Sequence, residues 1–267
     1  MVSLATGGYH ERHLARLLRS LERSGYRGRL LFWEPGRFPP GCPSHEEAPF
    51  AFKPACLDAA RSAGHELVLW IDASCVVLRD LAPAFRSLGA RGHLLFPNEG
   101  LLVGEWASDL ALVRLGLTRE EALRLPEVNA AAVGLDFRRE RAHRFLDRWL
   151  AIARDGATFR GVEEPVRSSG EYGEIKWNVG GRISSDDRVK GHRHDQTVAG
   201  VLAARLGMEL EPRGLDVIRH AASPLEPGGA IAKVRGAGPV DLAVIRMRVR
   251  GRDRVAAWRR PRSPDGV

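Results

Sequence analysis

The first thirty residues alternate between short apolar runs and a helical period. Residues 2–6 are apolar and are followed by Gly7 and Gly8, which predicts a strand and a turn. Four leucines then recur at the spacing of one face of an amphipathic helix: Leu14, Leu17, Leu18 and Leu21. Gly25 ends that helix, and residues 29–32 predict a second strand. This strand–helix–strand opening predicts an α/β fold with a mostly parallel central sheet flanked by helices.

The same alternation continues through most of the chain. A helix is predicted from Lys53 and Pro54 to Gly64, because proline is favoured in the first helical turn. It leads into residues 67–71, an uninterrupted apolar run typical of a strand buried on both faces. Four further segments complete the pattern, namely a strand at 94–96, a helix at 140–154, a helix from 194 to Gly207 and a late strand at 240–249.

Composition favours one globular domain. Hydrophobic residues make up 44% of the 267 positions, enough for a sizeable core. No apolar stretch approaches the roughly 20 residues of a membrane-spanning helix, and the first residues lack the features of a signal peptide. The cysteines, Cys42, Cys56 and Cys75, have no metal-binding spacing and fit a reducing compartment. We therefore expect a cytoplasmic protein with its domain at residues 1–245.

The net charge of +8 is concentrated at one end. Residues 246–262 hold eight arginines and one acidic residue, so the rest of the chain is nearly neutral. Residues 246–267 are therefore interpreted as a basic C-terminal tail, either solvated or in peripheral contact with an anionic surface such as a membrane. A nearly neutral body gives no reason to expect a nucleic-acid partner.

Asp72 is the most informative single position. It follows the buried strand at 67–71, which places it at the carboxyl edge of the sheet, where open α/β folds bind their ligands. A carboxylate there can hold a divalent cation that neutralises a diphosphate. The alternative is that Asp72 only caps the turn through Ala73 and Ser74.

Three passages of the chain together resemble GT-A glycosyltransferases, especially family 8-like and related bacterial enzymes. Residues 67–83, LVLWIDASCVVLRDLAP, resemble the strand, the DxD motif and the "lrDL.P.f" passage of that family. Residues 128–134, VNAAAVG, resemble its "NaGv" strand, and His194-Asp195-Gln196 resembles the start of its "DQ" helix. The resemblance extends over most of residues 1–225 and implies a single, Rossmann-like GT-A domain.

The resemblance also implies roles for individual residues. Asp72 would hold a metal and the ribose or diphosphate of a nucleotide-sugar donor, with Thr6 and Ser74 in the same donor site. Asn129 would line the sugar pocket, and Asp195 would bind sugar hydroxyls. Gln196 would lie under the reacting anomeric carbon, as in sugar-retaining members. Lys53 would pair with a donor phosphate.

Ser74 departs from the family pattern, because the second acid of the DxD motif is missing. Serine binds Mg²⁺ or Mn²⁺ weakly, so a metal would need Asp72 and a distant ligand, for which His220 is the candidate. His220 has the alternative of an ordinary surface histidine. Arg219 can instead place positive charge against the leaving diphosphate without metal.

Two other functions remain open on the sequence. One is a non-catalytic relative that binds a nucleotide or glycan, and the other is a metal-dependent hydrolase using His192, His194 and Asp195. For the transferase, the acceptor is a glycan, a lipid-linked sugar or a small molecule. The loop around Trp177, which includes Tyr172, Lys176 and Asn178, is either an acceptor-binding lid or an ordinary packed loop.

Overall fold

The computed structural model describes residues 1–5, 9–33, 37–165, 176–211, 219–220 and 231–233. The helices are α1 (Tyr9–Arg23), α2 (Phe52–Ser62), α3 (Ala82–Arg91), α4 (Asp109–Leu115), α5 (Arg119–Ala122), α6 (Glu140–Asp155), α7 (Ala157–Arg160) and α9 (His194–Arg205), with short 3-10 turns η1 (Val103–Glu105) and η2 (Val179–Gly181). The strands are β1 (Val2–Leu4), β2 (Leu31–Trp33), β3 (Leu67–Ile71), β4 (Cys75–Val77), β5 (His93–Leu102), β6 (Pro126–Asp136), β7 (Arg219–His220) and β8 (Ile231–Lys233).

The central sheet has five strands in the order β2-β1-β3-β6-β5. Strands β2, β1 and β3 are parallel, and β6 is antiparallel to both β3 and β5. Four strands therefore run in one direction and β6 alone is reversed, which confirms the predicted mostly parallel α/β sheet. Because β6 is reversed, its first residues lie at the carboxyl edge of the other four strands.

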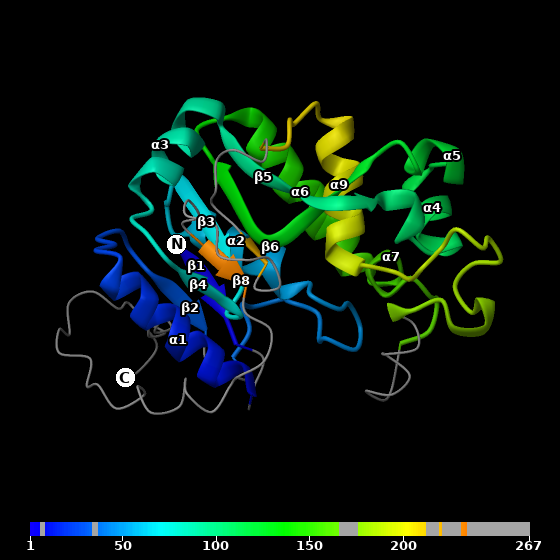
Figure 1. Ribbon diagram of the computed structural model, residues 1–267, viewed down its shortest axis with the longest axis horizontal. Helices are drawn as coiled ribbons and strands as arrows, with labels where there is room; N and C mark the ends of the chain where they lie inside the picture. The colour runs from blue at the N-terminus through cyan, green and yellow to red at the C-terminus, as the bar shows by residue number, and fades with distance from the viewer. Residues whose placement is uncertain (6–8, 34–36, 166–175, 212–218, 221–230, 234–267) are drawn as a thin grey trace, which may run out of the picture.

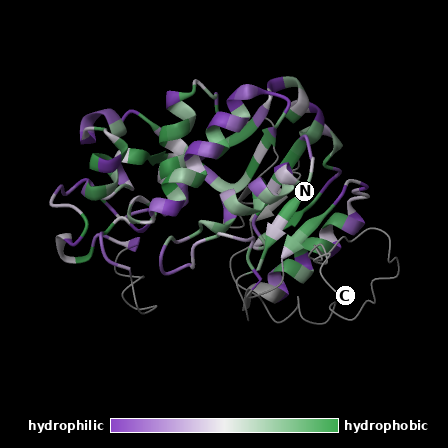
Figure 2. Ribbon diagram, turned by 180° about the vertical axis from the view of Figure 1, so that it is seen from behind, coloured by the Kyte–Doolittle hydropathy of each residue, from purple (hydrophilic) through white to green (hydrophobic). Residues whose placement is uncertain are grey.

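Helices cover both faces of this sheet (Figure 1). Val68 and Trp70 of β3 pack with residues of α2, α6 and α9, whereas Leu69 and Ile71 pack with α1, α3 and β4. The period of two along β3 thus places successive side chains in opposite cores. Figure 2 shows mostly hydrophobic strands, and hydrophilic residues that recur along the covering helices. Among the described helices, none has the length and apolarity needed to cross a bilayer.

Helix α9 approaches β6 closely because it carries a glycine at the contact. A Cβ added to Gly200 would lie 2.9 Å from Val103 Cγ2 and 3.1 Å from the carbonyl oxygen of Pro126. These distances leave no room for a larger side chain. The contact sets the middle of α9 against the beginning of β6, at the carboxyl edge of the sheet.

A second sheet has the order β4-β8-β7. Its strand β4 begins at Cys75, three residues after Asp72, and Cys75 pairs with Lys233 of β8. Lys233 pairs in turn with His220 of β7. Strands β7 and β8, which are far away in the sequence, therefore pair with the segment that follows β3.

Most predicted elements are present, with small shifts at their ends. Strand β3 and the start of α6 coincide with the prediction, α2 begins one residue earlier, and β5 is longer than the predicted 94–96. Helices α3, α4, α5 and α7 were not predicted. The predicted late strand at 240–249 and the basic tail lie outside the described residues.

Candidate functional site

Three separate segments bring charged side chains together at the carboxyl edge of the sheet. Lys53 lies in the first turn of α2, Asp72 follows β3, and Asp195 lies in the first turn of α9. The Lys53 Nζ atom is 2.8 Å from Asp195 Oδ2 and 3.3 Å from Asp72 Oδ1, and it donates a hydrogen bond to the carbonyl oxygen of Ala130 at 3.0 Å. Lys53, Asp72 and Asp195 are called the lysine cluster below.

The lysine cluster is nearly closed to solvent. The side chains of Lys53 and Asp195 are 5% and 1% exposed, and that of Asp72 is 19% exposed. Burial alone would lower the pKa of the Lys53 ammonium, but the Asp195 and Asp72 carboxylates outweigh it and raise that pKa above its ordinary value. A charged lysine thus lies between two carboxylates and contacts both of them.

Asp72 is fixed by its strand and by a tryptophan. Its backbone N–H donates to Ala131 of β6, and its Oδ1 atom accepts a hydrogen bond from Trp70 Nε1 at 2.9 Å. Trp70 itself is 1% exposed, so it belongs to the core, and its indole N–H also orients the carboxylate. The partly exposed Asp72 is the member of the cluster that a ligand reaches first.

Asn129 lies beside Asp72 on the reversed strand. Its Oδ1 atom accepts from the backbone N–H of Ala131, the residue whose carbonyl oxygen accepts from Asp72. Asn129 is 4% exposed. The structure therefore brings Asn129 to the same edge as Asp72 and Asp195, with its amide turned partly toward its own strand.

Gln196 follows Asp195 and belongs to a second group of polar residues. Its Oε1 atom accepts from Asn98 Nδ2 at 3.1 Å, and the same Nδ2 donates to Glu127 Oε2 at 2.8 Å. Arg193 Nε is 3.6 Å from Glu127 Oε2. Asn98, Glu127, Arg193 and Gln196 are called the glutamate cluster below.

Sequence analysis missed three members of the glutamate cluster. Asn98 and Glu127 lie in apolar stretches of β5 and β6, and both are buried. The only signal was the presence of polar residues inside a buried strand. The run from Pro126 to Asn129 contains two such residues, Glu127 and Asn129. Such residues are buried only with hydrogen-bonding partners, so they mark a site when a second polar residue is nearby.

Several predicted site residues have only a partial description. Thr6 lies outside the described residues, and for Arg219 and His220 only the backbone of β7 is described. His220 is two strands away from Cys75 through Lys233, a separation of roughly 10 Å between backbones. Ser74 lies near Asp72, and its carbonyl oxygen accepts from Arg16 Nη2 at 3.1 Å.

The described residues supply only part of a metal site. Within the described ranges, no three His, Cys, Asp or Glu side chains gather in a way that could hold a metal ion. Asp72 Oδ1 already accepts from Trp70 and faces the Lys53 ammonium. A cation at Asp72 would therefore need donors from elsewhere, and His220 is the one that the sequence offers.

His192 and His194 are used by the fold rather than by a metal. His192 Nδ1 accepts from the backbone N–H of Ser108, and Nε2 donates to the carbonyl oxygens of Thr158 and Phe159. His194 Nδ1 bonds the carbonyl oxygen of Phe159 at 2.7 Å. Burial lowers the pKa of His192 to about 4. This arrangement does not support the alternative of a hydrolase site with both histidines as ligands.

The loop around Trp177 is pinned to the segment that leads into α9. Trp177 pairs with Gly191 in an isolated bridge, and the Asn178 side chain bonds four backbone groups of the loop. Trp177 is 50% exposed and packs edge-on against Trp106, over which Arg193 lies at 4.4 Å. Tyr172 lies outside the described residues.

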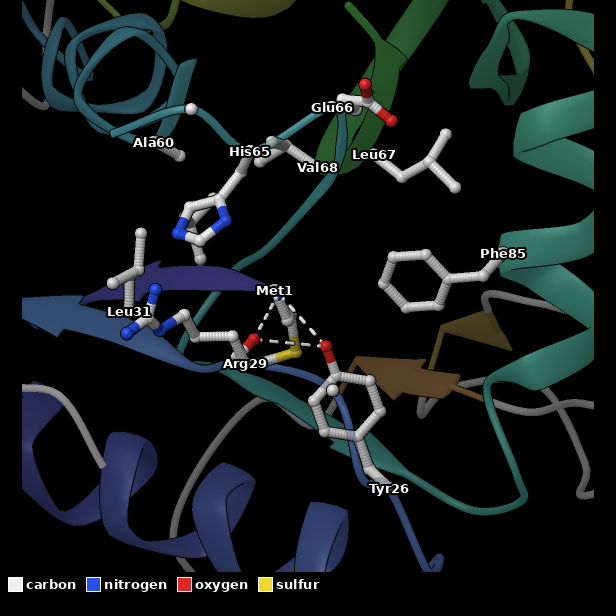
Figure 3. Close-up of a pocket in the computed structure, with 13 residues that line it drawn as sticks. Met1, Tyr26, Arg29, Leu31, Ala60, His65, Glu66, Leu67, Val68 and Phe85 are labelled. Atoms are coloured by element: carbon white, nitrogen blue, oxygen red, sulfur yellow. Dashed lines mark hydrogen bonds between the residues drawn. The ribbon is translucent and has the colours of Figure 1, made fainter. Parts of the chain in front are cut away.

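A separate hollow lies at the opposite edge of the sheet. It measures about 410 Å³ and is lined by residues at the amino ends of β1, β2 and β3, among them Met1, Tyr26, Arg29, His65 and Glu66, and by Phe85 of α3 (Figure 3). The Met1 amino group donates to Tyr26 Oη and to the Arg29 carbonyl oxygen there. None of the predicted site residues lines this hollow, so it is distinct from both clusters.

Comparison with known proteins gives matches of structure only. No protein-family description and no curated protein sequence matches the chain. Mouse xyloside xylosyltransferase 1 in its apo form is 10% identical, with a TM-score of 0.47 and coverage of 87% of this chain and 96% of that one. The galactosyltransferase LgtC, in complex with donor and acceptor sugar analogues, is 11% identical with a TM-score of 0.42, covering 88% and 87%.

A third match is WbbM, a bifunctional glycosyltransferase in its apo form. It is 9% identical, with a TM-score of 0.49, and the match covers 88% of this chain and 45% of that one. The function inferred below therefore rests on the residues of this chain. Its structure is similar to these three sugar-transferring proteins, at low identity.

Proposed function

We propose that the chain is a glycosyltransferase that takes a sugar from a nucleotide-diphosphate donor on a GT-A-like domain spanning residues 1–245. The observation that carries this proposal is the lysine cluster. Its three members come from three separate segments, and the sequence analysis gave each of them a role in binding the donor. One ammonium group contacts both carboxylates. Asn129 lies at the same edge, next to Asp72.

The cluster suits the transfer of a sugar in the following way. Asp72 is the accessible carboxylate and would accept hydrogen bonds from the ribose of the donor. Asp195 would bind sugar hydroxyls, and Gln196 would lie under the anomeric carbon, consistent with retention of configuration. The bond from the anomeric carbon to the diphosphate breaks, a bond to an acceptor hydroxyl forms, and the hydroxyl proton is released. Orientation of the reacting groups is the main contribution of these residues.

Lys53 acts in this proposal as a positioning residue. Its ammonium is buried between the two carboxylates, and it fixes the distance between the donor-binding and sugar-binding sides. The contact with a donor phosphate predicted from the sequence stays a prediction, because ligand binding would have to free Lys53 from a carboxylate. Positive charge for the leaving diphosphate can come from Arg219 or from a divalent metal at Asp72 and His220. Such a metal, Mn²⁺ or Mg²⁺, would neutralise the diphosphate.

The remaining features follow from the same proposal. The acceptor is a glycan, a lipid-linked sugar or a small molecule that enters beside Trp177, and no nucleic acid is involved. The tail at residues 246–267 would bring the domain to an anionic surface by charge attraction. A cytoplasmic enzyme with peripheral membrane contact fits this set of expectations.

The first test is a thermal-shift panel of nucleoside diphosphates and nucleotide sugars, each with and without Mn²⁺. A ligand at a hundredfold excess over its Kd stabilises a protein by about 2.7 kcal/mol, which a melting curve resolves. A shift that increases with Mn²⁺ supports a metal at Asp72. A metal-independent shift indicates that Arg219, rather than a metal, supplies the positive charge for the leaving diphosphate. The proposal is wrong if no nucleotide shifts the melting temperature.

The second test separates an enzyme from a non-catalytic binder. Release of nucleoside diphosphate from the bound nucleotide sugar is measured for the wild type, for Asp72→Ala and for Asp195→Asn. An enzyme should lose turnover by about two orders of magnitude or more in both variants. Glu140→Gln, on the exposed face of α6, is the matched control and should change nothing. Binding without turnover in the wild type would favour the non-catalytic alternative.

A further inference from the structure

Glu127 is a buried carboxyl group with an incomplete set of partners. It is 0% exposed, it is the second residue of strand β6, directly after Pro126, and its Oε2 atom accepts one hydrogen bond from Asn98. Among the described residues, its Oε1 atom has no hydrogen-bond partner although it is closed to solvent. An ionised carboxylate left in this state would be strongly disfavoured.

Asn98 connects Glu127 to Gln196. One amide nitrogen donates both of its hydrogens, one to Glu127 Oε2 at 2.8 Å and one to Gln196 Oε1 at 3.1 Å. Because an amide group is planar, fixing one N–H direction also fixes the other. Glu127 thereby determines where Asn98 donates, and Asn98 determines which end of the Gln196 amide is its oxygen.

The charges around Glu127 do not compensate its burial. Burial, with smaller contributions from the carboxylates of Asp195 and Glu105, raises the pKa of Glu127 to about 8 against the opposing effects of Arg193 and Asn98. Arg193 is the cation that faces Glu127, but its Nε is 3.6 Å from Oε2 and its guanidinium lies over the Trp106 ring. These surroundings favour the protonated form of Glu127 at neutral pH.

We propose that Glu127 is a positioning residue that, as a neutral carboxylic acid, uses Asn98 to hold the Gln196 amide in the orientation needed at the reacting sugar. This inference rests on the proposed function, because it assigns a purpose to the orientation of Gln196. Glu127 does not touch the substrate, since it is closed to solvent behind Asn98. Ionisation adds a buried charge that attracts Arg193 and the Asn98 amide, and so disturbs Gln196.

The experiment is the pH dependence of nucleoside diphosphate release from the nucleotide sugar that the panel identifies. For the wild type, kcat should fall as the pH rises through about 8. Glu127→Gln keeps the shape of a neutral carboxyl group, so it should retain kcat at pH 7 within about threefold and lose the alkaline fall. Asn98→Ala should lower kcat by about tenfold or more at every pH with little change in KM.

A matched control separates this effect from the general cost of a buried carboxyl group. Glu211 is also buried, its pKa is also raised by burial, and it pairs with Arg91 away from both clusters. Glu211→Gln should alter the melting temperature and leave the alkaline fall of kcat in place. An alkaline fall that persists in Glu127→Gln, or one that disappears in Glu211→Gln, would overturn the inference.

A spectroscopic readout distinguishes this inference from the proposed function. A difference infrared spectrum between the wild type and Glu127→Gln should show the carbonyl stretch of a protonated carboxyl group at pH 7, which disappears above pH 8. Without that band Glu127 is ionised and the inference is wrong, whether or not the chain is an enzyme. If the band is present but no nucleotide sugar is turned over, the proposed function is wrong, and so is the role of Gln196 at the reacting sugar.

Discussion

Asp195 and Glu127 are two buried carboxyl groups at the same edge of the sheet, yet their surroundings differ in one respect. The Lys53 ammonium lies 2.8 Å from Asp195, whereas Glu127 has the Asn98 amide at 2.8 Å and the Arg193 Nε atom at 3.6 Å. The first arrangement raises the pKa of Lys53, and the second leaves that of Glu127 near 8. Burial therefore does not set the charge of a site, and the nearest partner does.

Because of this difference, the two clusters suit different functions. The lysine cluster holds charge in place and includes the accessible Asp72, so it suits the binding of polar substrate groups. The glutamate cluster is closed and neutral at Glu127, so it suits the orientation of a neighbouring amide. The following changes test this division, beginning with the one of largest expected effect.

Lys53→Met should cost the most, because it leaves two carboxylates without their cation. We expect the free energy of unfolding to fall by about 3–5 kcal/mol, the usual loss when one partner of a buried ion pair is removed. Urea denaturation measures this value. Lys190→Met is the matched control, because the Lys190–Glu105 pair is exposed and should contribute less than about 1 kcal/mol. Equal losses in the two variants would contradict the role given to Lys53.

Glu127→Gln should stabilise the protein in alkaline but not in acidic solution. The folded-state pKa of about 8 lies above the ordinary value of 4.5, so the folded protein binds the extra proton. Wild-type stability should therefore decrease as the pH rises from about 4.5 to about 8 and then level off, a change of a few kcal/mol at most. Melting temperatures at pH 4.5, 6 and 8 check this. A constant difference between variant and wild type would show that Glu127 does not titrate as inferred.

Gly200→Ala should disturb both clusters at once, because it moves the beginning of α9 away from β6. The added Cβ would meet Val103 and Pro126, so we expect a loss of about 1–3 kcal/mol from overpacking. Gly89→Ala, in helix α3, is the control, since its added Cβ meets nothing closer than 3.4 Å. That change should be neutral or stabilising by up to about 1 kcal/mol. The comparison is made by denaturation and by nucleotide-induced thermal shift.

Trp177→Ala should have the smallest effect. Trp177 is half exposed and contacts Trp106, which holds Arg193 on its ring. The loss of one aromatic pair predicts a decrease of about 0.5–1 kcal/mol in stability. Without Trp177, the Trp106 ring loses a packing partner and holds Arg193 less firmly. Arg193 can then approach Glu127 and stabilise its carboxylate, which lowers the pKa of Glu127 and moves the alkaline fall of kcat slightly to lower pH. A shift in the opposite direction would contradict that view.

The sequence alone determined several of the main helices and strands and the first members of the site. Leu67–Ile71 predicted β3 because a continuous apolar run of that length fits a strand buried on both faces, and Asp72 followed at its end. The helical period predicted α1, α6 and α9, and thereby the position of Asp195 in a first helical turn. These predictions succeed because each depends on the local pattern of apolar and polar residues.

Only the tertiary structure decided which polar residues meet. The reversal of β6 places Glu127 and Asn129 at the carboxyl edge beside Asp72, and no local pattern records strand direction. The approach of α9, permitted by Gly200, then brings Asp195 to Lys53 and Gln196 to Asn98. The charge of each carboxyl group depends on those contacts between distant segments. The sequence therefore identified Asp72 and Asp195, whereas Glu127 and the charge of all three acids became apparent only from the packing.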